Sequence, residues 1–183
     1  MDKAQFENRF SKVESLNNER LKRAYGIMSN DCKKMLELVP ILLNYNNPKI
    51  PGYVSSDVPY GIDGFKPNFS QKNYLIKHGI DPNLPSRGKY SIYALYAMGS
   101  TSSIAQSLSS DLDLWVCISK DVPIEQVNLL ANKCKFISAL AKNIGAEINL
   151  FVTVEDRFLS GDHGAMDTED CGSAQGLFLL DEF

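Results

Sequence analysis

The segment that most constrains the fold runs from Asp111 to Val116, where acidic and apolar residues alternate as DLDLWV. Successive side chains of a β-strand point to opposite faces, so this alternation predicts a strand with one buried face. Asp111 and Asp113 would then share a face with Trp115, and the leucines between them would pack in a core. Two carboxylates held close together repel each other, and a bound divalent cation offsets that repulsion. The segment therefore predicts a strand that presents a metal-binding carboxylate pair.

A glycine–serine pair, Gly99-Ser100, precedes this strand and follows an apolar strand expected over about 91–97. Glycine lets the backbone approach a phosphate closely, and a serine hydroxyl and the N–H groups of a following helix can hold phosphate oxygens. A short helix is expected over about 102–108. An isolated Asp-x-Asp is most often a solvated edge strand, but the turn upstream favours a site for metal-dependent nucleotidyl transfer.

The remaining pattern predicts helices around a sheet. Apolar residues recur at three- and four-residue spacing in two expected helices, at about 3–28 and 123–144. A helix over about 31–45 is expected after an N-cap at Ser29 or Asn30, and a short helix over 70–78 is expected to end at Gly79. Pro40 should kink or divide the helix over 31–45. A further strand is expected over 147–154. The order of strand, turn, Asp-x-Asp strand, long helix and strand is the core pattern of a nucleotidyltransferase half-barrel.

Length and composition fit one domain. The chain has 183 residues, of which 44% are hydrophobic and 22% charged, enough for one sizeable core. We expect a single domain over 1–183, with a helical and loop-rich segment over 1–80 and the catalytic sheet over 88–183. The chain stops inside an apolar element at 177–183, which indicates a fragment of a longer protein.

Charge and cysteine content exclude several classes. The net charge of −3 argues against a general nucleic-acid surface. No apolar run is long enough for a membrane span, and the charged start MDKAQFENRFSK is unlike a secretory signal. None of the 4 cysteines forms a C-x-x-C pair, so we interpret them as buried thiols rather than disulfides or a zinc site. These features predict a cytoplasmic protein.

Longer motifs point to one family. The run YAMGSTSSIAQSLSSDLDLWVC resembles the class I adenylate cyclases of gamma-proteobacteria, as do LLNYNNPKIPGY and EDCGSAQGLFLLDEF. The resemblance covers nearly the whole chain in collinear order and corresponds to the N-terminal catalytic part of such an enzyme. It implies an α+β, polymerase-β-like nucleotidyltransferase fold with a mixed central sheet flanked by helices. It also implies a lyase that converts ATP to 3′,5′-cyclic AMP and pyrophosphate.

On this resemblance, Asp111 and Asp113 are the predicted ligands of two Mg²⁺ ions, with Mn²⁺ as an alternative. One ion would activate the ribose 3′-hydroxyl for attack on the α-phosphate, and the other would neutralise the triphosphate and the departing pyrophosphate. A third catalytic carboxylate is expected on a neighbouring strand, and Glu147 is our candidate. Three later acidic residues are alternatives: Glu155, Asp156 and Asp170.

The predicted phosphate contacts come from serines and the glycine turn. Gly99 and Ser100 would form the phosphate cradle, with a simple capped turn as the alternative. Ser103 and Ser110 match the family run, but they fit equally well as an early-helix residue and as a cap at the start of the strand.

Aromatic and basic residues complete the predicted substrate contacts. Trp115 lies on the carboxylate side of its strand, where it would contact ribose or base, and a core aromatic is the alternative. Arg23 and Arg87 fall where the family has basic residues and would balance the charge of the triphosphate.

Two other functions stay open on the sequence. One is a nucleotidyltransferase that moves a nucleotide to a separate acceptor, and the other is a catalytically incomplete nucleotide-binding module. The resemblance also implies regulation by sugar phosphotransferase-system proteins, acting through a C-terminal region absent from this chain. ATP is the predicted ligand, and no nucleic-acid partner is expected.

Overall fold

The computed structural model describes residues 2–83, 91–102 and 107–154. The elements in these ranges are α1 (Lys3–Ile27), α2 (Asn30–Asn44), α3 (Phe69–Lys77), β1 (Ile92–Ala97), the 3₁₀ helix η1 (Gly99–Ser102), β2 (Leu112–Ile118), α4 (Ile124–Asn143) and β3 (Ile148–Val154). The long helices and the strands lie where the sequence predicts them, with ends that differ by about a residue. No helix in the described ranges is both long and apolar enough to cross a membrane.

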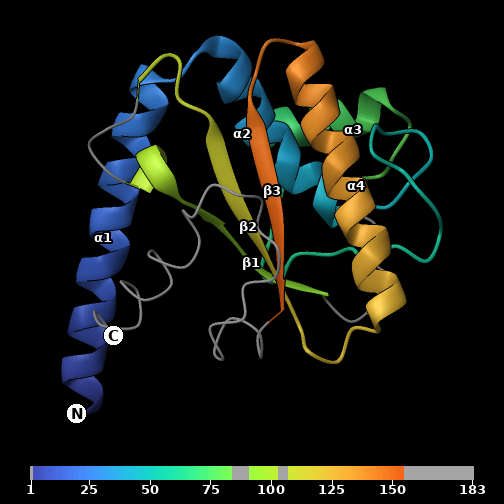
Figure 1. Ribbon diagram of the computed structural model, residues 1–183. Coiled ribbons are helices and arrows are strands. Elements are labelled where there is room, and N and C mark those ends of the chain that lie inside the picture. Colours follow the sequence, from blue (N-terminus) through green and yellow to red (C-terminus); the bar gives the residue numbers. More distant parts are fainter. Residues whose placement is uncertain (1, 84–90, 103–106, 155–183) are drawn as a thin grey trace.

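The acidic strand β2 is the centre of a mixed sheet with the order β1-β2-β3 (Figure 1). β1 pairs with it antiparallel and places Tyr96 opposite Trp115. β3 pairs with it parallel and places Asn149 opposite Asp113. Parallel neighbours need a crossover, which α4 supplies between β2 and β3. The predicted α+β class with a mixed sheet is therefore confirmed.

One face of β2 belongs to the hydrophobic core. Its buried residues alternate along the strand: Leu112, Leu114, Val116 and Ile118. They join a cluster that includes Met35 of α2 and Ile137 of α4, both 0% exposed. Burying one such side chain contributes about 1.5–3 kcal/mol, so this alternation fixes which face of the strand turns inward. The N-terminal helix α1 lies away from α4 and packs beside η1 (Figure 1).

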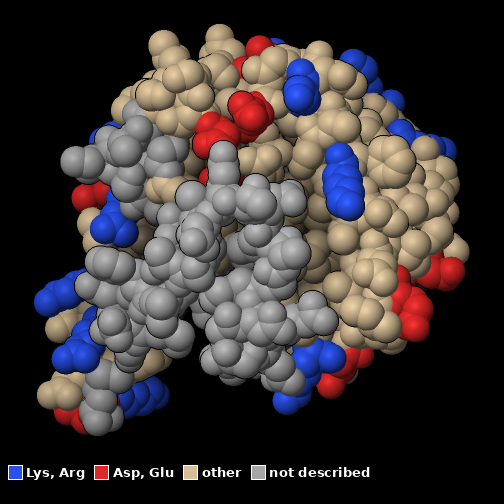
Figure 2. Space-filling model, viewed as in Figure 1, with Lys and Arg blue, Asp and Glu red and all other residues tan. Residues whose placement is uncertain are grey.

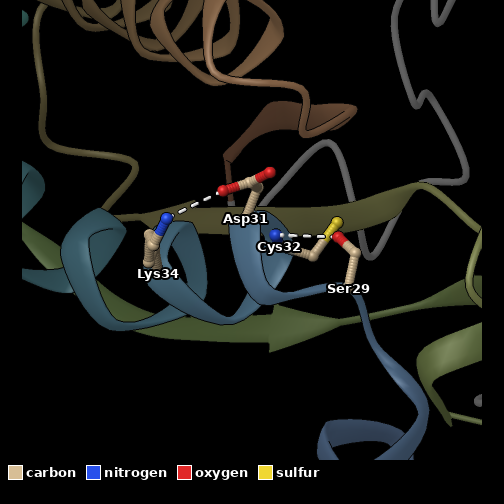
Figure 3. Close-up of polar contacts among 4 residues, drawn as sticks. All are labelled: Ser29, Asp31, Cys32 and Lys34. Carbon is tan, nitrogen blue, oxygen red and sulfur yellow. Dashed lines mark hydrogen bonds and ion pairs between the residues drawn. The ribbon is translucent and has the colours of Figure 1, made fainter.

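Local capping chemistry explains where α2 begins. Ser29 Oγ accepts a hydrogen bond from the Cys32 N–H at 3.1 Å, and Lys34 donates to Asp31 at 2.9 Å in the first turn (Figure 3). An N-cap of this kind stabilises a helix by about 1 kcal/mol. Pro40 does not divide α2, which runs as one helix to Asn44.

The cysteines in the described ranges are free thiols. Cys32 and Cys134 are buried, and Cys117 is half-buried. Burial raises the pKa of Cys117 to about 11 and that of Cys134 to about 12, so both stay protonated near neutral pH. The interpretation as buried thiols is confirmed for Cys32 and Cys134, and Cys117 is a free thiol that is only partly buried. Cys171 lies outside the described residues.

A buried lysine ties α4 to the segment that follows α2. Lys133 is 1% exposed, and its Nζ donates to the carbonyl oxygen of Tyr45 at 3.0 Å and to Asn46 Oδ1 at 3.4 Å. The same segment crosses α4 closely at Gly52, where an added Cβ would lie 3.1 Å from Ile137 Cγ1. Burial lowers the pKa of Lys133 to about 8, because neither acceptor carries a formal charge that would offset desolvation.

This lysine should make stability depend on pH. Its pKa is about 8 in the folded chain against an ordinary value of 10.5, so the unfolded chain binds more protons between those values. The buried charge on Lys133 therefore lowers the free energy of unfolding at low pH, and this destabilisation decreases as the pH rises through that window. Lys133→Met removes the titration but keeps much of the apolar stem.

Chemical denaturation of both proteins at about pH 7 and about pH 9 measures this effect. The unfolding free energy of the wild type should gain about 1 kcal/mol relative to the variant on going to the higher pH. The other groups titrate in both proteins and cancel in the difference. Parallel pH profiles for the two proteins would contradict the account of Lys133.

Candidate functional site

The two aspartates meet at the N-terminal end of β2. Asp113 lies on the strand, Asp111 directly precedes its first residue, and both are half-buried. The amide Nδ2 of Asn149 donates to Asp111 Oδ2 at 3.3 Å and to Asp113 Oδ1 at 2.9 Å. Because one atom lies within hydrogen-bond distance of both carboxylates, the carboxylates converge on a common point. The predicted placement of the pair on one face of the strand is confirmed.

Asn149 is not among the residues that the sequence predicts for this site. It comes from β3, where the parallel register places it directly opposite Asp113. The alternation of Glu147-Ile148-Asn149-Leu150 puts Glu147 and Asn149 on one face, but only the register of β3 against β2 decides which of them meets the aspartates. Asn149 differs from the predicted Glu147 in carrying a neutral amide, which cannot serve as a third carboxylate.

Glu147 lies one residue before β3 begins, and it is exposed. Its backbone carbonyl accepts the Leu112 N–H at 3.0 Å, which extends the pairing of the two strands to the level of the aspartates. The catalytic role of its carboxylate stays a prediction. The alternatives Glu155, Asp156 and Asp170 lie outside the described residues.

The glycine turn is packed against one of the two aspartates. The Met98 N–H donates to the backbone oxygen of Asp113 at 2.8 Å, which fixes the start of η1 to β2. Gly99 has a φ of +62°, and an added Cβ there would lie 3.2 Å from Asp113 Oδ2. Glycine therefore satisfies two constraints, a left-handed backbone and a carboxylate in close contact.

The serines predicted to hold phosphate occupy different positions. Ser100 lies in η1, and Ser103 lies outside the described residues. Ser110 closes a turn, because its Oγ accepts the Ser107 N–H at 2.9 Å. The helix expected over about 102–108 is wrong at its end, since Ser107 and Leu108 are not helical and the helical turn begins at Gly99. The phosphate contacts of the serines stay predictions.

Trp115 shares the strand face of Asp113 but is only 2% exposed. It faces Tyr96 of β1 and Phe151 of β3 across the sheet. Its burial agrees with the alternative that it is a core aromatic beneath the site. Its contact with ribose or base stays a prediction.

Arg23 is exposed on α1, the helix that packs beside η1. Lys and Arg side chains extend along the lower left edge of Figure 2, where Figure 1 draws this helix. The helix therefore brings positive charge to the side of the molecule that carries the glycine turn. Arg87, the second predicted basic contact, lies outside the described residues.

The carboxylate pair suits a cation that brings some of its own ligands. Among the described residues, no group of three or more His, Cys, Asp or Glu side chains gathers into a metal site. Mg²⁺ is commonly held by one or two carboxylates, several waters and the phosphates of a substrate. The convergence of Asp111 and Asp113, which both offer hard oxygen donors, fits that mode of binding.

Comparison with known proteins places this α+β domain in a family. The family model for the adenylate cyclase NT domain matches residues 5–183. The chain is 39% identical to the adenylate cyclase of Salmonella typhimurium, 38% to that of Escherichia coli K12 and 40% to that of Yersinia pestis. Each match extends over 176 residues, 94% of this chain and 21% of the relative.

The chain therefore belongs to the adenylate cyclase N-terminal domain family. It spans about a fifth of the length of these curated relatives. No solved structure matches it.

The fit of Gly99 can be tested by three alanine substitutions. Gly99→Ala should destabilise the chain by more than about 1 kcal/mol, because it combines a left-handed backbone with crowding of Asp113. Gly64→Ala isolates the backbone effect, since Gly64 has a φ of +66° with nothing within 4 Å. Gly26→Ala, inside α1 with nothing within 4 Å, should instead stabilise by roughly 0.5–1 kcal/mol.

Chemical denaturation gives all three values on one scale. The account requires the order Gly26→Ala, Gly64→Ala, Gly99→Ala from most to least stable. A Gly99→Ala chain as stable as the Gly64→Ala chain would show that the turn does not press on Asp113.

Proposed function

We propose that this chain is the catalytic nucleotidyltransferase-like domain of an adenylate cyclase, which converts ATP to 3′,5′-cyclic AMP and pyrophosphate. The observation that carries the proposal is the convergence of Asp111 and Asp113 on one point beside the Gly99 turn. The relatives named adenylate cyclase support the choice of reaction. The strand, turn, acidic strand, helix and strand in this order support a polymerase-β-like fold.

The reaction is an intramolecular displacement. The ribose 3′-hydroxyl loses its proton to solvent, its oxygen bonds to the α-phosphorus, and the bond from that phosphorus to the oxygen bridging to the β-phosphate breaks. Pyrophosphate leaves with that oxygen. Because both reacting groups belong to one molecule, positioning and charge stabilisation provide most of the catalysis. A bound Mg²⁺ or Mn²⁺ would neutralise phosphate charge and lower the pKa of the 3′-hydroxyl.

The residues of the chain have distinct roles in this proposal. Asp111 and Asp113 would hold one or two such cations through their carboxylate oxygens. Gly99 leaves space for phosphate beside Asp113, where a Cβ would otherwise crowd the carboxylate. Arg23, on the helix beside the turn, balances the charge of the triphosphate.

Neutralising either aspartate tests this function. Asp111→Asn or Asp113→Asn should lower cyclic AMP formation from ATP and Mg²⁺ at least about 100-fold, on the order of 3 kcal/mol of transition-state stabilisation. The fold should survive, because each change removes one of two repelling charges. Asp63→Asn, an exposed acid outside the site, is the matched control and should leave the activity unchanged.

The assay contains ATP and metal but no acceptor, and the product is identified by chromatography. Calorimetry with Mn²⁺ and ATP adds a readout that needs no turnover, in which either substitution should weaken nucleotide binding about tenfold, or 1.4 kcal/mol. Near-normal turnover and binding in either variant would overturn the assignment. Nucleotide transfer to an added acceptor without cyclic AMP would identify a transferase instead.

A further inference from the structure

Asn149 lies opposite Asp113 on β3, two residues after Glu147, the predicted third carboxylate. A single amide nitrogen, which carries two hydrogens, donates to Asp111 and to Asp113. Hydrogen bonds to charged groups are stronger than those between neutral groups, so the amide can offset part of the repulsion between the carboxylates. No carboxylate at this position could do so, because an ionised carboxylate only accepts hydrogen bonds.

The side chain of residue 149 has to face the pair. Ile148 and Leu150 flank it on β3 and belong to the core or pack against it, so the residue between them points to the other face. The parallel register then places it opposite Asp113 rather than elsewhere along β2. The choice of asparagine at this position therefore decides both the charge of the site and the support of the aspartates.

We propose that Asn149 is a positioning residue that holds Asp111 and Asp113 together before metal binds. Being neutral, it also leaves the site with too little negative charge to retain a divalent cation without the phosphates of a nucleotide. This inference rests on the proposed function, because it concerns how the metal–ATP complex is taken up. The cation then enters together with the nucleotide instead of waiting in the site.

The charge of the ligand set explains this behaviour. Affinity for hard cations rises with the number of charged ligands and with the rigidity of the site. The amide nitrogen of Asn149 also occupies the point on which the carboxylates converge, so a cation there has to displace it. Phosphate oxygens from ATP supply the missing negative charge and make that displacement favourable.

The test is a titration of the protein with Mn²⁺ alone, in which calorimetry or electron paramagnetic resonance measures the binding. Asn149→Asp should bind Mn²⁺ at least about tenfold more tightly than the wild type in the absence of nucleotide. Asn128→Asp adds the same charge at an exposed position of α4 and should change nothing. The double variant Asp113→Asn with Asn149→Asp restores two carboxylates and should return close to wild-type affinity.

A second variant tests the positioning role if Asn149→Asp does not fold. Asn149→Leu keeps a similar volume and neutral charge but donates no hydrogen bond. It should weaken binding of Mn²⁺ with ATP about fivefold or more, without tightening the binding of Mn²⁺ alone. Unchanged binding of Mn²⁺ with ATP in Asn149→Leu would overturn the positioning role.

These outcomes separate the inference from the proposed function. Wild-type binding of Mn²⁺ alone as tight as that of Asn149→Asp would overturn the inference, even if the chain forms cyclic AMP. Tighter binding in Asn149→Asp would support it, even if no cyclic AMP is formed and the proposed reaction is wrong.

Discussion

The parallel register of β2 against β3 is the constraint on which the candidate site depends. It places Asn149 opposite Asp113, and the backbone bond from Leu112 to Glu147 continues the pairing to the level of the aspartates. A slip of one residue would turn every side chain of β3 to the other face. Ile148 and Leu150 of β3 would then no longer face the core. The apolar packing that stabilises the sheet therefore also sets the geometry of the polar site.

The hydrophobic core and the candidate site thus use opposite faces of one strand. Leu112 and Leu114 of β2 are buried with the helices, while Asp111 and Asp113, which alternate with them, stay half-buried at one end of the sheet. The glycine turn is attached at the same end through the Met98 N–H. The strand β2 therefore carries Asp113 and begins directly after Asp111, and the turn next to it has a glycine without a Cβ beside the Asp113 carboxylate.

Much of the fold follows from local sequence patterns. Strict alternation predicts β2, three- and four-residue spacing predicts α4, and Gly145, with a φ of +89°, ends that helix as expected. The convergence of the aspartates is also predictable, because a strand places alternate residues on one face. These features depend on residues that are close together in the sequence, so the amino-acid sequence alone is enough to predict them.

Contacts between distant residues are what the sequence does not provide. Whether Glu147 or Asn149 meets the aspartates depends on the register of two strands separated by a helix, and the alternation allows both. The bonds from Lys133 to Tyr45 and Asn46 join residues far apart in the chain, although Lys133 looks like an ordinary helix-surface lysine. The start of the helical turn at Gly99 also involves a distant contact, because the Met98 N–H just before it donates to the backbone oxygen of Asp113.

The central claim is that Asp111 and Asp113 jointly hold a divalent cation together with ATP. Anomalous diffraction from crystals grown with Mn²⁺ and a non-cyclisable ATP analogue tests it most directly. We predict a manganese peak within about 2–2.5 Å of carboxylate oxygens from both aspartates and of a phosphate oxygen. A peak bound by the triphosphate alone, away from both carboxylates, would contradict the account.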